Sequence, residues 1–438
     1  MPESMAGIFE MDRPRMEAAY RRTSRRVVLP LALLIVLSSI DRVNISFAAL
    51  RMNAELGLDP KAYGFGASLF FVGYLLFQLP SMALLARWGA RWWIAGSVIG
   101  WGSAATAMAF INTREHFYAL RFVLGMFESG FAPGVVWYVS QWLPQEYRGR
   151  SIGLTLLAIP TSVVIGGPLC GALMTQDFGL IGGWRLMFLV EGLVTIAAGI
   201  AAACWFVDRP DQARWLPDVE REWTKRTIAA ERAAVGLRAE PEPLLSVLRR
   251  LLPWLCAGLW FVLVTASNVI IFWLPTAIKS FGTHDPLVIG LLSALPWLGI
   301  GLGMYFNAHH SDRTGERFRH IGAGALLGAA GLTGAALANS GGPAMLFLMV
   351  GGLGIGGAQT VFWTVPTRFF ADNPKMIATI NLVGNLSGVI APALIGWIIA
   401  KTASVSLPVY LLAALLLAGV GLLVAIRQSE KTDHQRNR

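Results

Sequence analysis

Apolar residues recur in runs of about 20 along nearly the whole chain, and each run is long enough to cross a bilayer as a helix. A helix satisfies its own backbone hydrogen bonds, so these runs predict membrane-spanning helices rather than strands. About twelve spans are expected, near residues 27–50, 63–86, 91–111, 117–142, 151–174, 184–207, 253–280, 287–309, 321–338, 344–370, 377–401 and 407–426. The pattern predicts an all-α membrane protein with twelve transmembrane helices in two six-helix halves.

A charged stretch between residues 208 and 250 divides this pattern in two. It contains four prolines and no spanning run, which predicts a cytoplasmic linker with a surface helix near its middle. The first 26 residues are basic but lack a cleavage site, so the first span is expected to direct insertion itself. The predicted domains are listed in chain order: N-terminal tail 1–26, six-helix bundle 27–207, linker 208–250, six-helix bundle 251–427 and C-terminal tail 428–438.

Composition agrees with a membrane protein, because 55% of residues are hydrophobic and only 14% are charged. The net charge of +10 could indicate nucleic-acid binding. However, most of the 36 Lys and Arg fall in segments that are cytoplasmic if the N-terminus is cytoplasmic. This positive-inside bias argues against nucleic acid as a partner and favours a multi-pass protein of a bacterial-type inner membrane with both termini in the cytoplasm. The three cysteines show no paired or ligand spacing, so neither a metal nor a cofactor is expected.

A short motif recurs after about half the chain. Arg87 and Arg91 enclose a glycine in the turn between the second and third spans, and Arg313 and Arg317 do so after Asp312 in the turn between the eighth and ninth. The matching positions favour a duplicated transporter with its site between the halves. We expect both turns to act as cytoplasmic gates.

Four charges lie inside predicted spans. Arg121 and Glu128 are two helical turns apart, so their side chains share one helix face, and Asp41 adjoins Arg42. Unpaired, these four groups would cost about 10 to 14 kcal/mol in the membrane, so we expect them to pair and to face the bundle interior. An arginine offers a fork that matches a carboxylate, and a buried acid beside it can bind and release a proton. The alternative is a static ion-pair network that only holds the first half together.

Several segments together resemble the anion:cation symporter family of the major facilitator superfamily. They are Asp41-Arg42-Val43-Asn44, FFVGYLLFQLP from Phe70, RFVLGMFESGFAPG with the following WLPQEYRGR, FWLP from Phe272, SDRTGER from Ser311, FWTVPTRFF from Phe362 and INLVGNLSGVIAPALIGW from Ile380. Members of that family move organic anions, many of them with protons. The resemblance implies the same for this chain.

The resemblance also implies roles for single residues. It assigns protonation to Asp41 and Glu128, and interaction with these acids or with the anionic substrate to Arg42 and Arg121. Further candidates for contact with substrate are listed here: Tyr74, Asn385, Asn268 and Trp363. For these four, interhelical packing and hydrogen bonding remain an alternative role. The family usually has an acid where this chain has Ala86, so the first gate is expected to be weaker or to rely on Arg87 and Arg91 alone.

The function predicted from these observations is proton-coupled uptake of a small organic anion by alternating access, with tartrate, a sugar acid or an aromatic acid as possible substrates. The expected partners are this anion, protons and the lipid bilayer, and the carrier is expected to be a monomer. An organic-anion exchanger or uncoupled facilitator remains an alternative. A polytopic membrane enzyme would need a catalytic loop, and a transporter-like sensor a signalling domain; the sequence shows neither.

Overall fold

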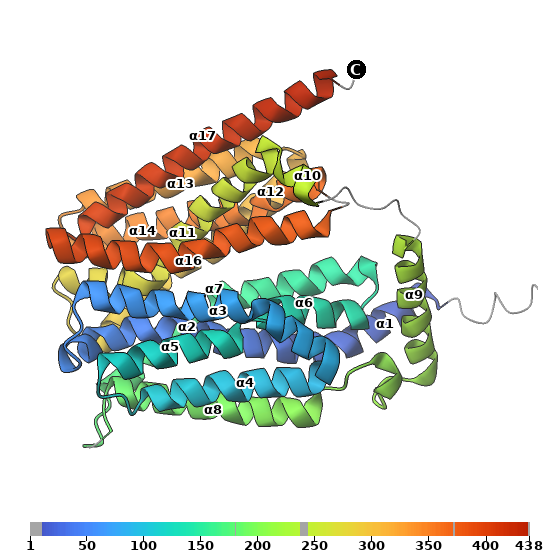
Figure 1. The fold of residues 1–438 in the computed structure, drawn as a ribbon, viewed down its shortest axis with the longest axis horizontal. Coiled ribbons are helices and arrows are strands. Elements are labelled where there is room, and N and C mark those ends of the chain that lie inside the picture. The colour runs from blue at the N-terminus through green and yellow to red at the C-terminus, as the bar shows by residue number, and fades with distance from the viewer. Residues whose placement is uncertain (1–10, 180, 237–243, 371–372, 437–438) are drawn as a thin grey trace, which may run out of the picture.

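The computed structural model describes residues 11–179, 181–236, 244–370 and 373–436. Within these ranges the chain is almost entirely helical (Figure 1). The first half contains α1 (Arg13–Thr23), η2 (Ser24–Val28), α2 (Leu29–Glu55), α3 (Pro60–Trp88), α4 (Ala90–Met108), α5 (Arg114–Glu128), α6 (Phe131–Trp142), α7 (Gln145–Thr175) and α8 (Trp184–Trp205). After the short η3 (Pro210–Gln212) come α9 (Asp218–Gly236), α10 (Leu244–Leu248), α11 (Leu251–Ser280), α12 (Pro286–Thr314), α13 (Phe318–Leu337), α14 (Gly341–Phe362), α15 (Thr364–Phe369), α16 (Pro374–Thr402) and α17 (Ser406–Arg436).

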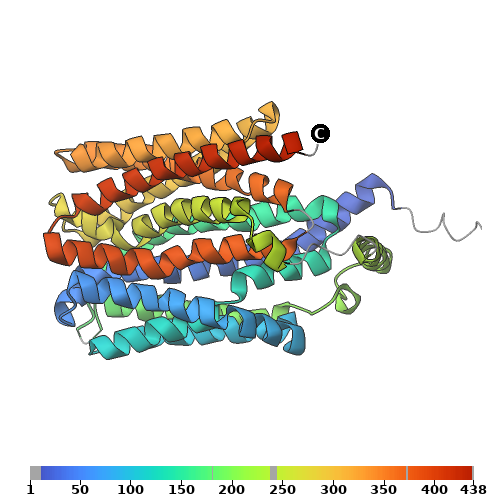
Figure 2. The same cartoon turned by 45° about the horizontal axis from the view of Figure 1, so that its top comes forward.

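The long helices form two bundles that lie side by side, one from α2 to α8 and one from α11 to α17 (Figures 1 and 2). The bundles contact one another mainly along two helix pairs, α3 with α16 and α7 with α12, with a smaller contact between α2 and α11. Eleven of the described helical segments are long and apolar enough to cross a membrane. The predicted third span forms α4, which is not among the eleven because its 19 residues include Arg91 and three tryptophans.

The predicted fourth span is not one continuous helix. Helix α5 ends at Glu128 and α6 begins at Phe131, with Ser129 and Gly130 between them. Pro133 explains the break, because its ring cannot donate a backbone hydrogen bond and collides with the carbonyl four residues before it. Glu128 therefore lies at the end of a helix, in the middle of the span.

The two bundles are tightly joined at the end that contains the turns before Pro60 and Pro286. A Cβ added at Gly64 would lie 2.3 Å from the carbonyl oxygen of Pro392, and one at Gly290 would lie 2.3 Å from the carbonyl oxygen of Gly167. Such separations are available only to glycine, so backbone touches backbone across both helix pairs. Lys279 adds a hydrogen bond from its Nζ to the Leu50 carbonyl, 3.1 Å long, between the bundles. This end of the molecule is closed.

The opposite end is open. A cavity of about 690 Å³ is lined by residues of both bundles, including Arg21, Arg150, Tyr305 and Asp312. Helix α1, helix α9 and the C-terminal end of α17 all lie at this end (Figure 1). Helix α9 is the expected linker helix, and it attaches to the first bundle through Glu231, which accepts a hydrogen bond of 2.8 Å from Arg148. The cavity that both bundles line therefore lies at the end opposite the glycine contacts.

Candidate functional site

An ion pair between α2 and α5 lies at the centre of the first bundle. Arg42 Nη2 contacts Glu128 Oε1, and the same oxygen accepts a hydrogen bond of 2.7 Å from Ser38 Oγ. Glu128 is 1% exposed, whereas the Arg42 side chain is 29% exposed. The second carboxylate oxygen, Glu128 Oε2, has no hydrogen-bond partner in the described structure. The pair thus joins a buried acid to an arginine that reaches accessible space.

Arg121 is buried but does not form an ion pair with Glu128, the partner that helical spacing predicts. Its side chain is 1% exposed, and its Nε and Nη2 lack hydrogen-bond partners within the described ranges. The guanidinium lies over the ring of Phe70, with 4.8 Å from Cζ to the ring centroid. A buried cation with free N–H groups can bind an anion that enters the site.

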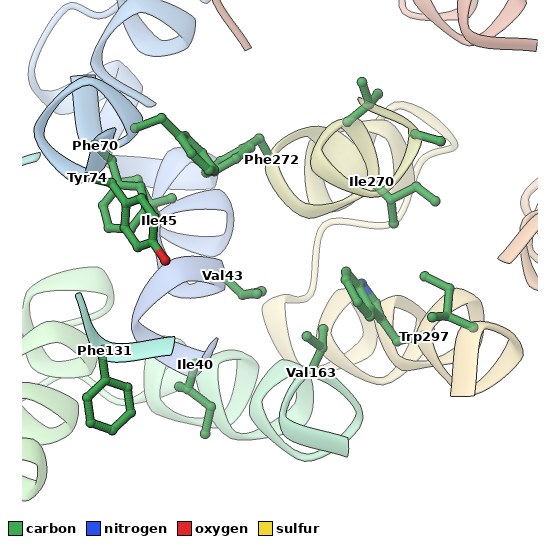
Figure 3. Packing of buried hydrophobic residues seen from close by; sticks show 14 of the residues in the cluster. Ile40, Val43, Ile45, Phe70, Tyr74, Phe131, Val163, Ile270, Phe272 and Trp297 are labelled. Atoms are coloured by element: carbon green, nitrogen blue, oxygen red, sulfur yellow. The ribbon is translucent and has the colours of Figure 1, made fainter. Parts of the chain in front are cut away.

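Aromatic side chains surround these arginines on the side facing the second bundle. Arg42 Cζ lies 5.3 Å from the Phe70 ring centroid and 5.8 Å from that of Tyr74. Figure 3 shows Phe70 and Tyr74 beside Ile45 of α2 and opposite Phe272 of α11. Phe70 and Tyr74 thus form an amphipathic wall, since their ring faces attract the guanidinium groups while Tyr74 can also form hydrogen bonds.

Asp41 does not pair with its neighbour Arg42. Consecutive helical residues point about 100° apart, and Asp41 faces α8 while Arg42 faces α5. Asp41 Oδ2 accepts a hydrogen bond of 3.2 Å from Thr195 Oγ1. Nearby, Glu191 of α8 accepts a bond of 2.9 Å from Asn44 Nδ2. Glu191 is not among the candidates predicted from the sequence, although it is the only acid in the 184–205 run, whose only other charged residue is Arg185 at its start.

The three candidates of the second bundle occupy different settings. Asn268 Nδ2 donates a 2.9 Å hydrogen bond to Ser387 Oγ, which joins α11 to α16 within the bundle. Trp363 packs edge-on against Trp260, with ring centroids 4.8 Å apart. Asn385 of α16 is half-buried. Asn268 and Trp363 therefore both have contacts within the second bundle.

The turn between α3 and α4, named here the first gating turn after its expected role, contacts an acid that its own sequence lacks. Asp208, just after α8, accepts a hydrogen bond of 2.9 Å from the backbone N–H of Arg91, and Arg91 Nε donates to the Ala203 carbonyl at 2.6 Å. Gly89 adopts a φ of +83°, which lets the Asp208 carboxylate lie where a side chain would otherwise be. A carboxylate from the segment after α8 therefore contacts this turn, in addition to the turn's own Arg87 and Arg91.

The second gating turn is held by its own residues. Arg317 Nη1 lies 2.6 Å from Asp312 Oδ1 and 2.9 Å from Ser311 Oγ. Gly315 ends α12 with a φ of +69°. Arg313 is exposed. Arg87 is exposed too and lines a cavity of about 770 Å³ between the first gating turn and the linker.

Comparison with protein families gives a match to the Major Facilitator Superfamily model over residues 31–392 and 283–438. A protein from Agrobacterium vitis with the name "Putative tartrate transporter" is 39% identical over 95% of this chain and 93% of its own length. The "Quinolone resistance transporter" of Acinetobacter baumannii is 34% identical over 91% of this chain and 93% of its own length. The names of these relatives describe different cargoes.

A bacterial homologue of the human lysosomal transporter Spinster, solved in an inward-facing and occupied conformation, superimposes with a TM-score of 0.73. The alignment covers 92% of this chain and 96% of that structure at 16% identity, so it shows a common fold.

Proposed function

Because the chain belongs to the major facilitator superfamily, we propose that this transporter imports a small organic anion together with protons by alternating access. The observation that carries the proposal is the state of Arg121, a buried guanidinium whose Nε and Nη2 lack partners in the described structure. An unpaired buried cation is unfavourable unless something compensates it during the transport cycle. A substrate carboxylate would supply that compensation.

The substrate class that fits best is a hydroxylated carboxylate of the tartrate or sugar-acid type. Arg121 and Arg42 offer two guanidinium groups, and a carboxylate matches either as a bidentate partner. Tyr74 adds a hydroxyl for a polar substrate group. We assign Asn385 of α16 to the opposite wall and give Asn268 and Trp363 supporting positions behind it. The relative named for tartrate agrees with this class.

Proton coupling would follow from competition for Arg42. In the present state the Glu128 side chain is 1% exposed and contacts Arg42. A substrate carboxylate that binds Arg42 would leave Glu128 without its cation, and a buried carboxylate without a cation binds a proton. Substrate and proton would therefore enter together. Asp41 is the second proton site in this scheme.

The direction of transport depends on orientation. With the basic segments and both termini in the cytoplasm of a bacterial-type cell, the open end is cytoplasmic and the glycine-packed end is outside. The state described here is then inward-open. In the outward-open state the Arg91 and Arg317 turns would help to close the cytoplasmic end, which they do not close here. We assign gating to these two turns, in a monomeric carrier.

Uptake of radiolabelled acids into proteoliposomes with purified protein tests the proposal. The panel contains tartrate, a hexonate, an aromatic carboxylate and a neutral sugar, each with and without an inward proton gradient. We expect one acid to accumulate only with the gradient, and Arg121→Gln to lose its binding. Gradient-independent equilibration by the wild type would instead support the uncoupled exchanger, in which the Arg42–Glu128 pair is a fixed scaffold. Uptake of the neutral sugar alone would overturn the anion class.

A further inference from the structure

A second cluster of polar side chains lies inside the first bundle, on the face of α2 that points away from Arg42. It combines Asp41 and Asn44 of α2 with Cys170 of α7 and with Glu191 and Thr195 of α8. Asn44 connects the two acids, because its Nδ2 lies 2.9 Å from Glu191 Oε2 and 3.5 Å from Asp41 Oδ1. Asp41 is 1% exposed, Glu191 6% and Asn44 0%. The cluster is therefore closed to solvent.

The two acids of this cluster differ from the other strongly buried acids. Glu128 contacts Arg42 and Glu220 contacts Arg22, whereas no Lys, Arg or His within the described ranges lies within 4.0 Å of the carboxylate oxygens of Asp41 or Glu191. Two negative charges so close together, away from water and without a cation, repel each other and lose their hydration. Such a pair is expected to keep a proton, as other paired carboxylates do.

The groups around the acids suit a site that gains and loses a proton. Thr195 Oγ1 donates to Asp41 at 3.2 Å and Cys170 Sγ donates to Glu191 at 3.2 Å, and a hydroxyl or thiol can reverse its role and accept. Asn44 Oδ1 is buried without a partner in the described structure. When the amide turns over, this oxygen becomes the acceptor that a protonated carboxyl group requires.

We propose that Glu191 shares a coupling proton with Asp41 at the Asn44 bridge, which makes Glu191 a further proton-carrying residue of the transporter. The inference rests on the proposed function, since it extends proton coupling from Asp41 to a partner that neither the family match nor the motifs indicate. The proton binds one carboxylate oxygen of the pair and leaves from it, and no other bond changes. The other titratable groups that face the pair are the Cys170 thiol on α7 and, across α2, Glu128 with Arg42.

The location of the pair couples it to the substrate site. Asp41 and Arg42 are neighbours on α2, so a rotation or shift of that helix moves the proton pair relative to α8 and the ion pair relative to α5 at once. Protonation of the acidic pair removes the repulsion between Asp41 of α2 and Glu191 of α8. It therefore favours one of two positions of α2 relative to α8. The inferred role of the Asp41–Glu191 pair is thus to transmit a change in its protonation to Arg42 through movement of α2 as one rigid helix.

The test compares wild type with Glu191→Gln, Glu191→Asp and the matched control Cys256→Ala, which alters a buried cysteine of α11 in the second bundle and leaves the whole cluster in place. Two quantities are measured against pH: the intensity of the carboxylic-acid C=O infrared band of the purified protein, and gradient-driven uptake of whichever acid of the proteoliposome panel accumulates. For Glu191→Gln we expect both midpoints to move to lower pH by about 1 unit, because the neighbouring charge that favours protonation is gone. Glu191→Asp keeps the wild-type profile, and so does Cys256→Ala.

Identical titrations of wild type and Glu191→Gln in both measurements would overturn the shared proton and leave proton coupling by Glu128 intact. If the infrared midpoint shifts but uptake does not respond to the proton gradient, the proposed coupling is refuted while the shared proton stands. If Glu191→Gln does not fold, Asp41→Asn is read in the same infrared titration, where the band of the remaining Glu191 must shift to lower pH. An unshifted band there overturns the pair.

Discussion

Replacing Arg121 by methionine should stabilise the substrate-free protein while abolishing its response to substrate. Removing a charge of this kind from water costs several kcal/mol even after the protein relaxes. The cation–π contact with Phe70, at 4.8 Å, returns about 0.5 to 2 kcal/mol. Because two guanidinium nitrogens have no partner in the described structure, a net penalty of about 1 to 4 kcal/mol remains in the empty carrier. Methionine is unbranched like the arginine stem and carries no charge, so it avoids that penalty.

Thermal unfolding of the purified protein, with and without the transported acid, measures both effects. At about 2 to 4 °C per kcal/mol for a bundle of this size, Arg121→Met should raise the substrate-free Tm by at least about 2 °C. Substrate at 100 times its Kd should stabilise the wild type by about 2.7 kcal/mol and leave the variant unchanged. Arg185→Met is the matched control: Arg185 pairs with Glu55 and donates to the Ile111 carbonyl at 3.3 Å, so its loss should lower Tm.

A lower substrate-free Tm for Arg121→Met, like that of Arg185→Met, would refute an uncompensated charge at Arg121. In that case the charge of Arg121 is already compensated in the empty protein, and it is not held ready for an anion. A variant that is stabilised yet still transports with the wild-type KM would also refute the binding role.

Three further changes probe other parts of the cycle. Glu128→Gln should keep substrate exchange across the membrane but lose gradient-driven accumulation, and counterflow beside net uptake separates the two; loss of exchange as well would contradict it. Gly64→Val should slow uptake at least 10-fold, since its Cβ would meet the Pro392 carbonyl oxygen at 2.3 Å, whereas Gly421→Val, whose Cβ meets nothing within 4 Å, should transport normally. Asp208→Asn should weaken the first gating turn by about 1.5 to 3 kcal/mol; a Tm equal to that of the wild type would argue against its role there.

The membrane helices could be predicted from the sequence because a 20-residue apolar run has few other structures available. The helix break at residues 129–130 is harder to predict from Pro133, since prolines also occur within continuous transmembrane helices. The pairing of the charges could not be predicted. Sequence proximity joins Asp41 to Arg42 and helical spacing joins Arg121 to Glu128, whereas the packing of α2 against α5 joins Arg42 to Glu128.

Two further residues of the structure, Asp208 and Glu191, could not be predicted because their contacts join segments far apart in the chain. Asp208 contacts the turn before α4 from more than a hundred residues away in the chain, so no local motif indicates it. Glu191 becomes significant only when α8 packs against α2 and brings its carboxylate to Asn44. Both depend on which helices are neighbours, and hydropathy carries no information about neighbours.

The glycine contacts at the closed end have a consequence for the energetics of the cycle. Where Gly64 meets Pro392 and Gly290 meets Gly167, backbone seals against backbone without ordering any long side chain. Closing such a seal therefore sacrifices almost no rotamer entropy, and opening it regains almost none. The closed and open forms of this end can then lie close in free energy.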